Sequence, residues 1–160
     1  MSQYICVDIG GTSIKHGVLD ENAIIKECNQ TKTEAWLGGA AVLDKVKTIG
    51  KQYKEQYENI EGICISTAGM VDPEEGELMP DYTGTCIKKE LEKALEMPCE
   101  VENDVNCAGL AEYVSGSAKE SHIMFCATVG TGIGGCAIVN GRVFHGASNS
   151  ACEVGYIPMG

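Results

Sequence analysis

The sequence has few basic residues. Twelve lysines and arginines stand against 23 aspartates and glutamates, so the net charge at pH 7 is −11. Nucleic acids and anionic membranes attract basic surfaces, and this charge therefore argues against either as a partner. An acidic protein that handles phosphate groups needs a metal ion to offset the repulsion between like charges.

Long apolar runs are also missing. No stretch approaches the roughly 20 apolar residues of a transmembrane helix, and the first residues have neither the basic start nor the apolar core of a signal peptide. We therefore expect a cytoplasmic protein. With 160 residues, 44% of them hydrophobic, the chain can form one domain with a real core, or one domain and part of another.

Metal-ligand spacings are absent as well. The sequence has three histidines, and its nine cysteines include no pair with C-x-x-C spacing, so no stretch predicts a zinc site. The cysteines are odd in number and lie mostly among valine, isoleucine and alanine. We interpret them as buried small hydrophobic residues in a reducing compartment.

The apolar pattern that is present predicts an α/β chain. Three strands on short turns, expected to form an antiparallel meander, precede an amphipathic helix, and the run Ile63-Cys64-Ile65 predicts a strand buried on both faces. A loop is expected at 67–73 and a polar surface connection at 74–85. The predicted strands cover 4–9, 14–19, 23–28, 61–66, 99–101, 123–129, 136–139 and 142–145, and the predicted helices cover 37–57, 87–95 and a segment starting at 103–104.

The first motif is a strand end with an acid and a double glycine, Asp8-Ile9-Gly10-Gly11-Thr12. It joins two predicted strands by a tight turn, whose glycines can take backbone angles closed to other residues and let main-chain N–H groups approach an anion. Asp8 is placed to hold a hydrated magnesium ion, and Thr12 and Lys15 to reach phosphate oxygens. Taken alone, the motif fits an ordinary glycine-rich hairpin with a solvated aspartate equally well.

Two further strand ends carry candidate residues. Gly69 follows a predicted strand at the edge where open α/β sheets bind ligands, although a plain loop explains it too. Asn103 and Asp104 begin a predicted helix, and capping accounts for one of them. An amide beside a carboxylate also suits the vicinal hydroxyls of a sugar. A carboxylate at a helix N-terminus stays ionised and can accept a proton from an attacking hydroxyl, so Asp104 is our candidate base.

The third motif follows the strand predicted at 123–129 and reads Gly130-Thr131-Gly132-Ile133-Gly134-Gly135. It matches the dinucleotide fingerprint G-x-G-x-x-G, but that fingerprint must open a helix, whereas here a strand and the hairpin signal Asn140-Gly141 follow. The order strand, glycine turn, strand, hairpin repeats that of residues 4–19. We interpret the two hairpins as phosphate-binding turns of two related lobes that close on one nucleotide.

In order along the chain, these motifs resemble the ROK family (repressor, open reading frame, kinase) of the actin/hexokinase-like superfamily: Asp8-Ile9-Gly10-Gly11-Thr12, Glu102-Asn103-Asp104-Val105-Asn106, Gly130-Thr131-Gly132-Ile133-Gly134-Gly135 and Glu153-Val154-Gly155-Tyr156. The resemblance implies an actin-like ATPase (ribonuclease H-like) fold, with a mixed five-stranded sheet flanked by helices. It implies a first lobe at 1–118, the start of a similar second lobe at 119–160, and further polypeptide that mediates a homodimer.

The resemblance also implies an ATP-dependent kinase that transfers the γ-phosphate of ATP to the 6-hydroxyl of a hexose, either glucose or an N-acetylhexosamine. Asp104 would be the base. The sugar-binding residues would be Gly69, Asn103, Asp104, Glu153 and Tyr156. The residues expected to bind ATP are Asp8, Gly10, Gly11, Thr12, Lys15, Gly130, Thr131, Gly132 and Gly134, and Asp8 would hold Mg²⁺ through water.

Two departures from the family pattern concern zinc and the sugar. Many members have histidine where Tyr156 stands, and that histidine completes a zinc site with later cysteines. Tyrosine is a poor zinc ligand, so zinc is doubtful and no zinc site is expected within this chain. Many members also have glycine where Cys152 stands. Both changes leave the preferred sugar open.

Two other functions stay open. The family includes sugar-responsive repressors, but these carry a helix-turn-helix ahead of the first glycine loop, whereas the first strand here starts by Tyr4 and the charge is acidic. The third alternative is a catalytically silent sugar-binding protein or an actin-like assembly subunit. The joint presence of Asp8, Asn103, Asp104 and Glu153 argues against it.

Overall fold

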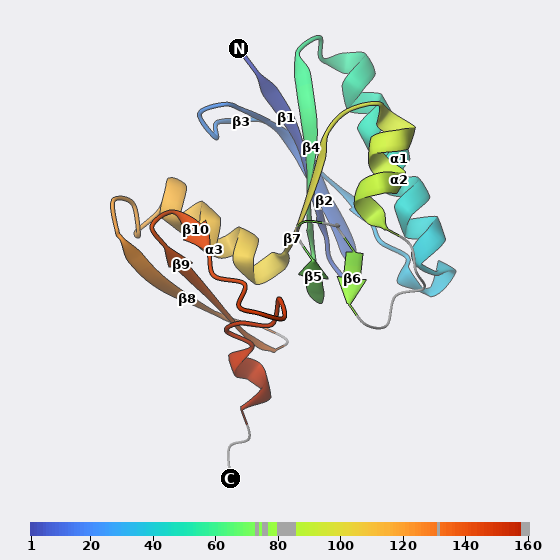
Figure 1. Cartoon of the computed structure of the whole chain (residues 1–160). Helices are drawn as coiled ribbons and strands as arrows, with labels where there is room; N and C mark the ends of the chain where they lie inside the picture. The colour runs from blue at the N-terminus through green and yellow to red at the C-terminus, as the bar shows by residue number, and fades with distance from the viewer. Residues whose placement is uncertain (73, 75–76, 80–85, 131, 158–160) are drawn as a thin grey trace. The chain divides into compact units, whose positions relative to one another are not determined.

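The computed structural model describes residues 1–72, 74, 77–79, 86–130 and 132–157 (Figure 1). The chain forms two compact units, Met1–Glu102 and Asn103–Gly160. Among the described residues, no helix is long and apolar enough to cross a membrane.

The first unit is built on a mixed sheet of five strands in the order β3-β2-β1-β4-β7. β1 pairs antiparallel with β2, which pairs antiparallel with β3, so the predicted meander is confirmed. β1 also pairs in parallel with β4, which makes the sheet mixed and confirms the predicted fold class. The strands are β1 (Gln3–Ile9), β2 (Ser13–Asp20), β3 (Ile25–Lys32), β4 (Ile60–Thr67) and β7 (Cys99–Asn103).

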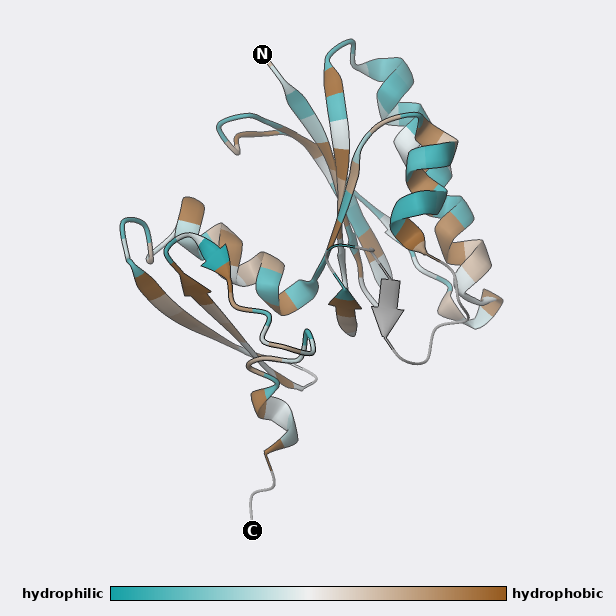
Figure 2. Ribbon diagram, viewed as in Figure 1, coloured by the Kyte–Doolittle hydropathy of each residue, from teal (hydrophilic) through white to brown (hydrophobic). Residues whose placement is uncertain are grey.

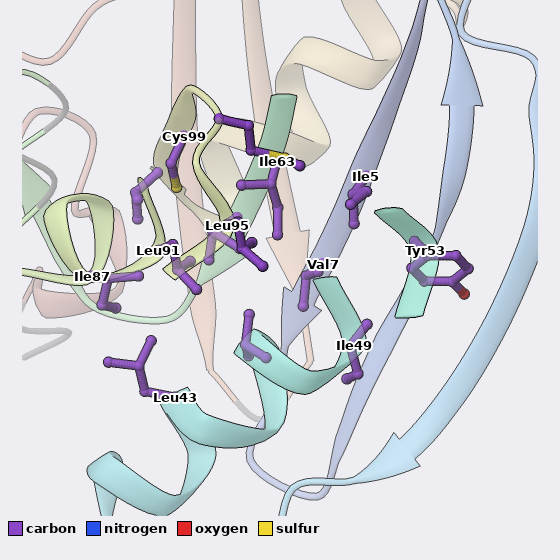
Figure 3. Close-up of a cluster of buried hydrophobic side chains, with 14 of the residues drawn as sticks. Ile5, Val7, Leu43, Ile49, Tyr53, Ile63, Ile87, Leu91, Leu95 and Cys99 are labelled. Carbon is purple, nitrogen blue, oxygen red and sulfur yellow. The ribbon is translucent and has the colours of Figure 1, made fainter. Parts of the chain in front are cut away.

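Two helices, α1 (Gly39–Gln56) and α2 (Ile87–Leu95), cover one face of this sheet (Figure 1). In α1 the buried apolar residues recur at helical spacing, because positions three and four apart share one side of a helix. They pack on alternate residues of β1 and β4, which point to the same face (Figure 3). Fully buried members of this core include Ile5, Val46, Ile63, Leu91 and Leu95.

The opposite face of β4 corrects one prediction. The run Ile63-Cys64-Ile65 led us to expect burial on both faces, but Cys64 is exposed while its two neighbours are buried in the core. The strand is therefore buried on one face only. The apolar run was misleading because cysteine counts as an apolar residue in it, although Cys64 points to the uncovered face. Of the nine cysteines expected to be buried, Cys86, Cys99 and Cys136 are, whereas Cys28 is exposed like Cys64 and the others are intermediate.

The segment after β4 corrects another prediction. Where a loop and a polar connection were expected, β5 (Met70–Asp72) pairs antiparallel with β6 (Glu77–Met79). Strands of three residues are too short to show a period-two pattern, so the sequence does not predict this hairpin. Val71 is 2% exposed and joins the core. Residues 73, 75–76 and 80–85 of the expected connection lie outside the described residues.

The second unit contains a three-stranded antiparallel sheet in the order β10-β9-β8. The predicted strand at 123–129 is confirmed, the strand predicted at 136–139 begins three residues earlier, and the return strand ends two residues sooner than expected. The elements are α3 (Asp104–Val114), β8 (Ile123–Val129), β9 (Ile133–Val139), β10 (Arg142–Val143) and the 3-10 helix η2 (Val154–Tyr156).

Helix α3 sets the boundary between the units. Its residues Val105, Leu110 and Tyr113 pack against a small core that includes Met124 and Ile138 of the second sheet. The contacts therefore place the boundary after residue 102, whereas the sequence predicts it after residue 118. The assignment of 1–118 and 119–160 to two functional lobes stays a prediction.

One face of the β8–β9 ladder is apolar along its whole length, and hydrophobic stretches mark both strands in Figure 2. Strong exposure is seen at Ile123 (73%), Phe125 (58%) and Val129 (84%). We call this surface the apolar face; its members, paired in register, are Ile123 with Val139, Phe125 with Ala137, Ala127 with Gly135 and Val129 with Ile133.

Candidate active site

The first glycine loop is a tight turn between β1 and β2. The Gly10 N–H donates to the carbonyl oxygen of Ser13 at 3.0 Å. A Cβ on Gly10 would lie 2.8 Å from the same oxygen, so this close approach requires glycine, whereas a Cβ on Gly11 would meet open space. Neither has a positive φ, so this turn does not use the backbone angles that glycine alone can take. Gly11 and Thr12 are exposed, as an anion-binding turn requires.

Three polar side chains stand in one row beside this loop. Asp8 is the register partner of Lys15 on β2 and of Ser66 on β4, so all three project from the same face. The Ser66 hydroxyl donates to Asp8 Oδ1 at 2.8 Å and orients the carboxylate. No local sequence pattern indicates Ser66, because only the pairing of β4 with β1 places it next to Asp8.

Asp8 fits a magnesium ion held through water. Mg²⁺ usually keeps several water molecules and takes one or two carboxylates together with substrate phosphates, so a single oriented carboxylate suffices. Within the described ranges, no three histidine, cysteine, aspartate or glutamate residues come together as a metal-binding group. A site with several direct protein ligands therefore has no donors among these residues.

Thr33 holds the glycine loop from the side and was not predicted. Its hydroxyl donates to the carbonyl of Gly10 at 2.6 Å, and its N–H donates to the carbonyl of Thr12 at 3.0 Å. The Lys45 ammonium in turn donates to the Thr33 carbonyl at 3.2 Å. Thr33 is 3% exposed, so these bonds are shielded from water and rigidify the loop.

Gly69 lies between β4 and β5, beyond the carboxyl end of β4. Its φ of 101° is in a region that only glycine adopts without strain. The backbone conformation explains why glycine stands here, and its contact with a sugar stays a prediction.

At the start of α3 the structure separates two adjacent candidates. Asn103 is the N-cap, and its side-chain oxygen accepts from the N–H groups of Val105 at 2.9 Å and Asn106 at 3.2 Å. The carboxylate of Asp104 is exposed in the first turn and also accepts from the Val105 N–H. Capping thus accounts for Asn103, and the Asp104 carboxylate stays open to solvent at the positive end of the helix dipole.

The second glycine loop joins β8 to β9, and no helix follows it, as predicted. Gly130 and Gly132 have open space where a Cβ would stand, which leaves room for a ligand. At Gly134, glycine is required by packing instead, because a Cβ at this position would lie 2.4 Å from Val105 Cγ2 of α3. Thr131 lies outside the described residues.

The segment with Glu153 and Tyr156 packs on the start of β9. A Cβ on Gly155 would lie 2.2 Å from the carbonyl oxygen of Ile133, so glycine allows this close approach. Glu153 is half-buried, whereas Tyr156 is 84% exposed. Cys152 has a φ of 65°, which explains physically why glycine is common at this position in the family that the sequence resembles.

The predicted site residues therefore form two groups, one in each unit. In the first unit, Asp8, Lys15 and the glycine loop share the carboxyl edge of β1, with Gly69 beyond the neighbouring β4. In the second unit, Val105 links the α3 start to the second glycine loop, and η2 packs on β9 directly after that loop. Each group joins a glycine loop to acidic or amide side chains, a combination suited to phosphates and hydroxyls.

Comparison with known proteins agrees with the family resemblance of the sequence motifs. The protein-family model described as ROK family matches residues 4–160. An uncharacterised protein of Clostridium perfringens is 50% identical over 98% of this chain and 55% of its own length. A β-glucoside kinase of Listeria monocytogenes is 32% identical over 94% of this chain and 51% of its own length.

Among solved structures, a ROK family glucokinase from Streptomyces griseus, in complex with glucose and AMPPNP, has a TM-score of 0.86 and 30% identity, covering 98% of this chain and 50% of the other. The chain thus spans about half the length of the relatives it matches.

Proposed function

The chain belongs to the ROK family, and we propose that it carries the phosphate loops and sugar-binding residues of an ATP-dependent kinase that phosphorylates the 6-hydroxyl of a hexose. The main support is the row of Lys15, Asp8 and Ser66 beside an exposed glycine turn. A cation, an oriented carboxylate and main-chain N–H groups together are what a nucleotide phosphate with its metal ion needs.

In the proposed reaction, main-chain N–H groups of the exposed residues Gly11 and Thr12 and the Lys15 ammonium neutralise phosphate charge. A magnesium ion held through water by Asp8 would supply further charge neutralisation. Thr33 and Ser66 keep the loop and the Asp8 carboxylate in place, so little reorganisation is needed when the nucleotide binds. Gly130 and Gly132 provide the phosphate turn of the second unit.

Asp104 is the proposed general base. Its exposed carboxylate accepts the proton of the 6-hydroxyl while that oxygen forms a bond to the γ-phosphorus, and the bond from phosphorus to the bridging oxygen of ADP breaks. Asn103 and Glu153 are proposed to hold the other sugar hydroxyls.

The sugar is proposed to be glucose, with an N-acetylhexosamine as the nearest alternative. The glucokinase and the β-glucoside kinase among the similar proteins both act on glucose or a glucose derivative by name. The whole protein is proposed to be a cytoplasmic homodimer, in keeping with the cysteines expected of a reducing compartment and with the family resemblance.

The test is ADP release by the complete protein with Mg-ATP against a panel of hexoses, N-acetylhexosamines and β-glucosides, with a sugar-free control. Release that depends on one sugar supports the kinase and names its substrate. Sugar binding without ADP release across the panel would instead support a silent sensor or a regulator.

A further inference from the structure

Cys6 and Cys64 stand side by side on neighbouring parallel strands. Cys6 of β1 is the register partner of Cys64 of β4, and Figure 1 shows the two strands adjacent. Both side chains point away from the helix-covered face that buries Ile5 and Ile63. The Cys6 thiol donates a hydrogen bond to Cys64, which lowers the pKa of Cys64. The two side chains therefore lie next to each other on one face of the sheet, and Cys64 is exposed.

This placement suits a disulfide. Neighbouring strands lie about 4.8 Å apart, which falls within the roughly 4.4–6.8 Å that separates the Cα atoms of bonded cysteines. Because register partners project in the same direction, a small local shift brings the sulfur atoms to bonding distance. A cross-strand bond of this kind is of the labile type that reductants open readily.

We propose that Cys6 and Cys64 form a redox modification site that a peroxide converts reversibly to a disulfide. The Cys64 thiolate attacks one peroxide oxygen, the O–O bond breaks, and a sulfenic acid and one water result. The Cys6 thiol then attacks the sulfenyl sulfur and forms the S–S bond, the S–O bond breaks, and the thiol proton leaves with the displaced hydroxide as a second water. The two thiols lose two electrons, and one hydrogen peroxide is reduced to two waters.

The other cysteines provide the contrast. Cys28 is also exposed, but its register partner is Gly17, which separates it from Cys6 by a residue without a side chain. Cys99 is buried, and burial raises its pKa to about 12, so its thiol stays protonated and inert. Of these cysteines, only Cys64 is both exposed to a soluble oxidant and next to a second thiol, that of Cys6.

The disulfide would act on the proposed phosphate site. Asp8 and Ser66 form the next register pair on the same face, two residues further along the same strands. The local shift that brings the two sulfur atoms to bonding distance is expected to move the Ser66 hydroxyl that orients Asp8. This consequence, unlike the chemistry of the pair, rests on the proposed kinase function, and we expect oxidation to lower sugar-dependent ADP release several-fold.

The test treats the native protein with hydrogen peroxide, blocks free thiols, and maps disulfides by mass spectrometry after digestion. A peptide containing Cys6 linked to one containing Cys64 is expected, and dithiothreitol should remove it. Cys28→Ser, the matched control, should give the same link. Cys6→Ser should leave the Cys64 sulfenic acid without its partner, so that it proceeds to sulfinic acid.

Two results would contradict the proposed redox site. One is equal oxidation of Cys28 and Cys64 without a cross-link, and the other is a Cys6–Cys64 link that forms only in the protein unfolded by urea. Mass spectrometry needs no kinase activity, so the site can be found even if the proposed function fails. ADP release from the same samples tests the consequence for Asp8, which would be wrong if the fully linked protein kept its turnover.

Discussion

At the level of single residues, the start of α3 shows how one pattern can carry two roles. Asparagine and aspartate are both favoured helix caps, and the sequence alone cannot say which of the two closes the helix. The structure gives this role to Asn103, which accepts from two backbone N–H groups, and leaves the Asp104 carboxylate exposed. Stability and chemistry at this point are therefore assigned to neighbouring residues.

Substitution of the cap should separate its two proposed roles. Asn103→Ala removes the acceptor of two backbone N–H groups and should lower the free energy of unfolding by about 1 kcal/mol. Asn103→Ser keeps a capping oxygen and should retain most of that stability, yet lose sugar affinity because the amide is gone. Urea unfolding and sugar binding measure the two effects. A serine variant that binds sugar normally would remove Asn103 from the sugar site.

Cys152 is a second residue whose backbone makes a prediction. Its φ of 65° is costly for any residue with a Cβ, and glycine removes that cost while it adds backbone entropy to the unfolded chain. Cys152→Gly should therefore raise the free energy of unfolding by about 0.5–1 kcal/mol. Cys126→Gly, within β8, is the control and should lower it. A loss of stability in Cys152→Gly would mean that the cysteine side chain outweighs the backbone strain.

At the level of elements, local signals were sufficient where periodicity is strong. Helix α2 has the predicted bounds of 87–95, and the strand predicted at 123–129 is β8 without change. The β5–β6 hairpin was missed because three-residue strands carry no period. Ser66 and Thr33 were missed for another reason, since their partners Asp8 and Gly10 are far away in the sequence and meet them only through the tertiary fold.

The contact between the meander and α1 predicts a pH dependence. His16 of β2 hydrogen-bonds through Nδ1 to the Tyr53 hydroxyl at 2.9 Å and through Nε2 to the Thr31 hydroxyl at 3.0 Å. Burial lowers the pKa of His16, although the nearby Glu27 carboxylate opposes this shift. The folded state therefore favours neutral histidine, and the unfolded chain binds the proton more readily.

Stability should consequently fall as the pH drops below about 6.5, the ordinary pKa of histidine, and level off below the folded-state pKa. Urea midpoints measured between pH 7.5 and pH 5.5 test this, and His16→Gln should flatten the profile. His122→Gln, at an exposed position, is the matched control. An unchanged slope in His16→Gln would assign the pH dependence to other groups.

At the level of the whole molecule, the two units differ in how completely their sheets are covered. Helices α1 and α2 close one face of the first sheet, whereas α3 packs on one side of the second. The apolar face on the other side is exposed at Ile123, Phe125 and Val129, although Cys152 and Val154 lie against Gly135. A contiguous exposed apolar surface of this kind promotes association between protein molecules. Sequence patterns indicated strands here, but burial on each face depends on which helices meet the sheet, and this is a property of the complete fold.

The chain should therefore self-associate through the apolar face as its concentration rises. Phe125→Glu places a charge in the middle of this face and should shift sedimentation towards the monomer without loss of helix content. Leu37→Glu introduces the same charge at another exposed apolar side chain and serves as the control. Equal effects of both variants would attribute the change to net charge alone.

The central claim is phosphoryl transfer with Asp104 as the base, and turnover of Asp104→Asn in the complete protein tests it most directly. ADP release with Mg-ATP and the preferred sugar should fall roughly 100- to 10,000-fold, with only a modest change in sugar binding. Asp44→Asn, which removes an exposed carboxylate from α1, should keep wild-type turnover. Near-native turnover of Asp104→Asn would contradict the claim.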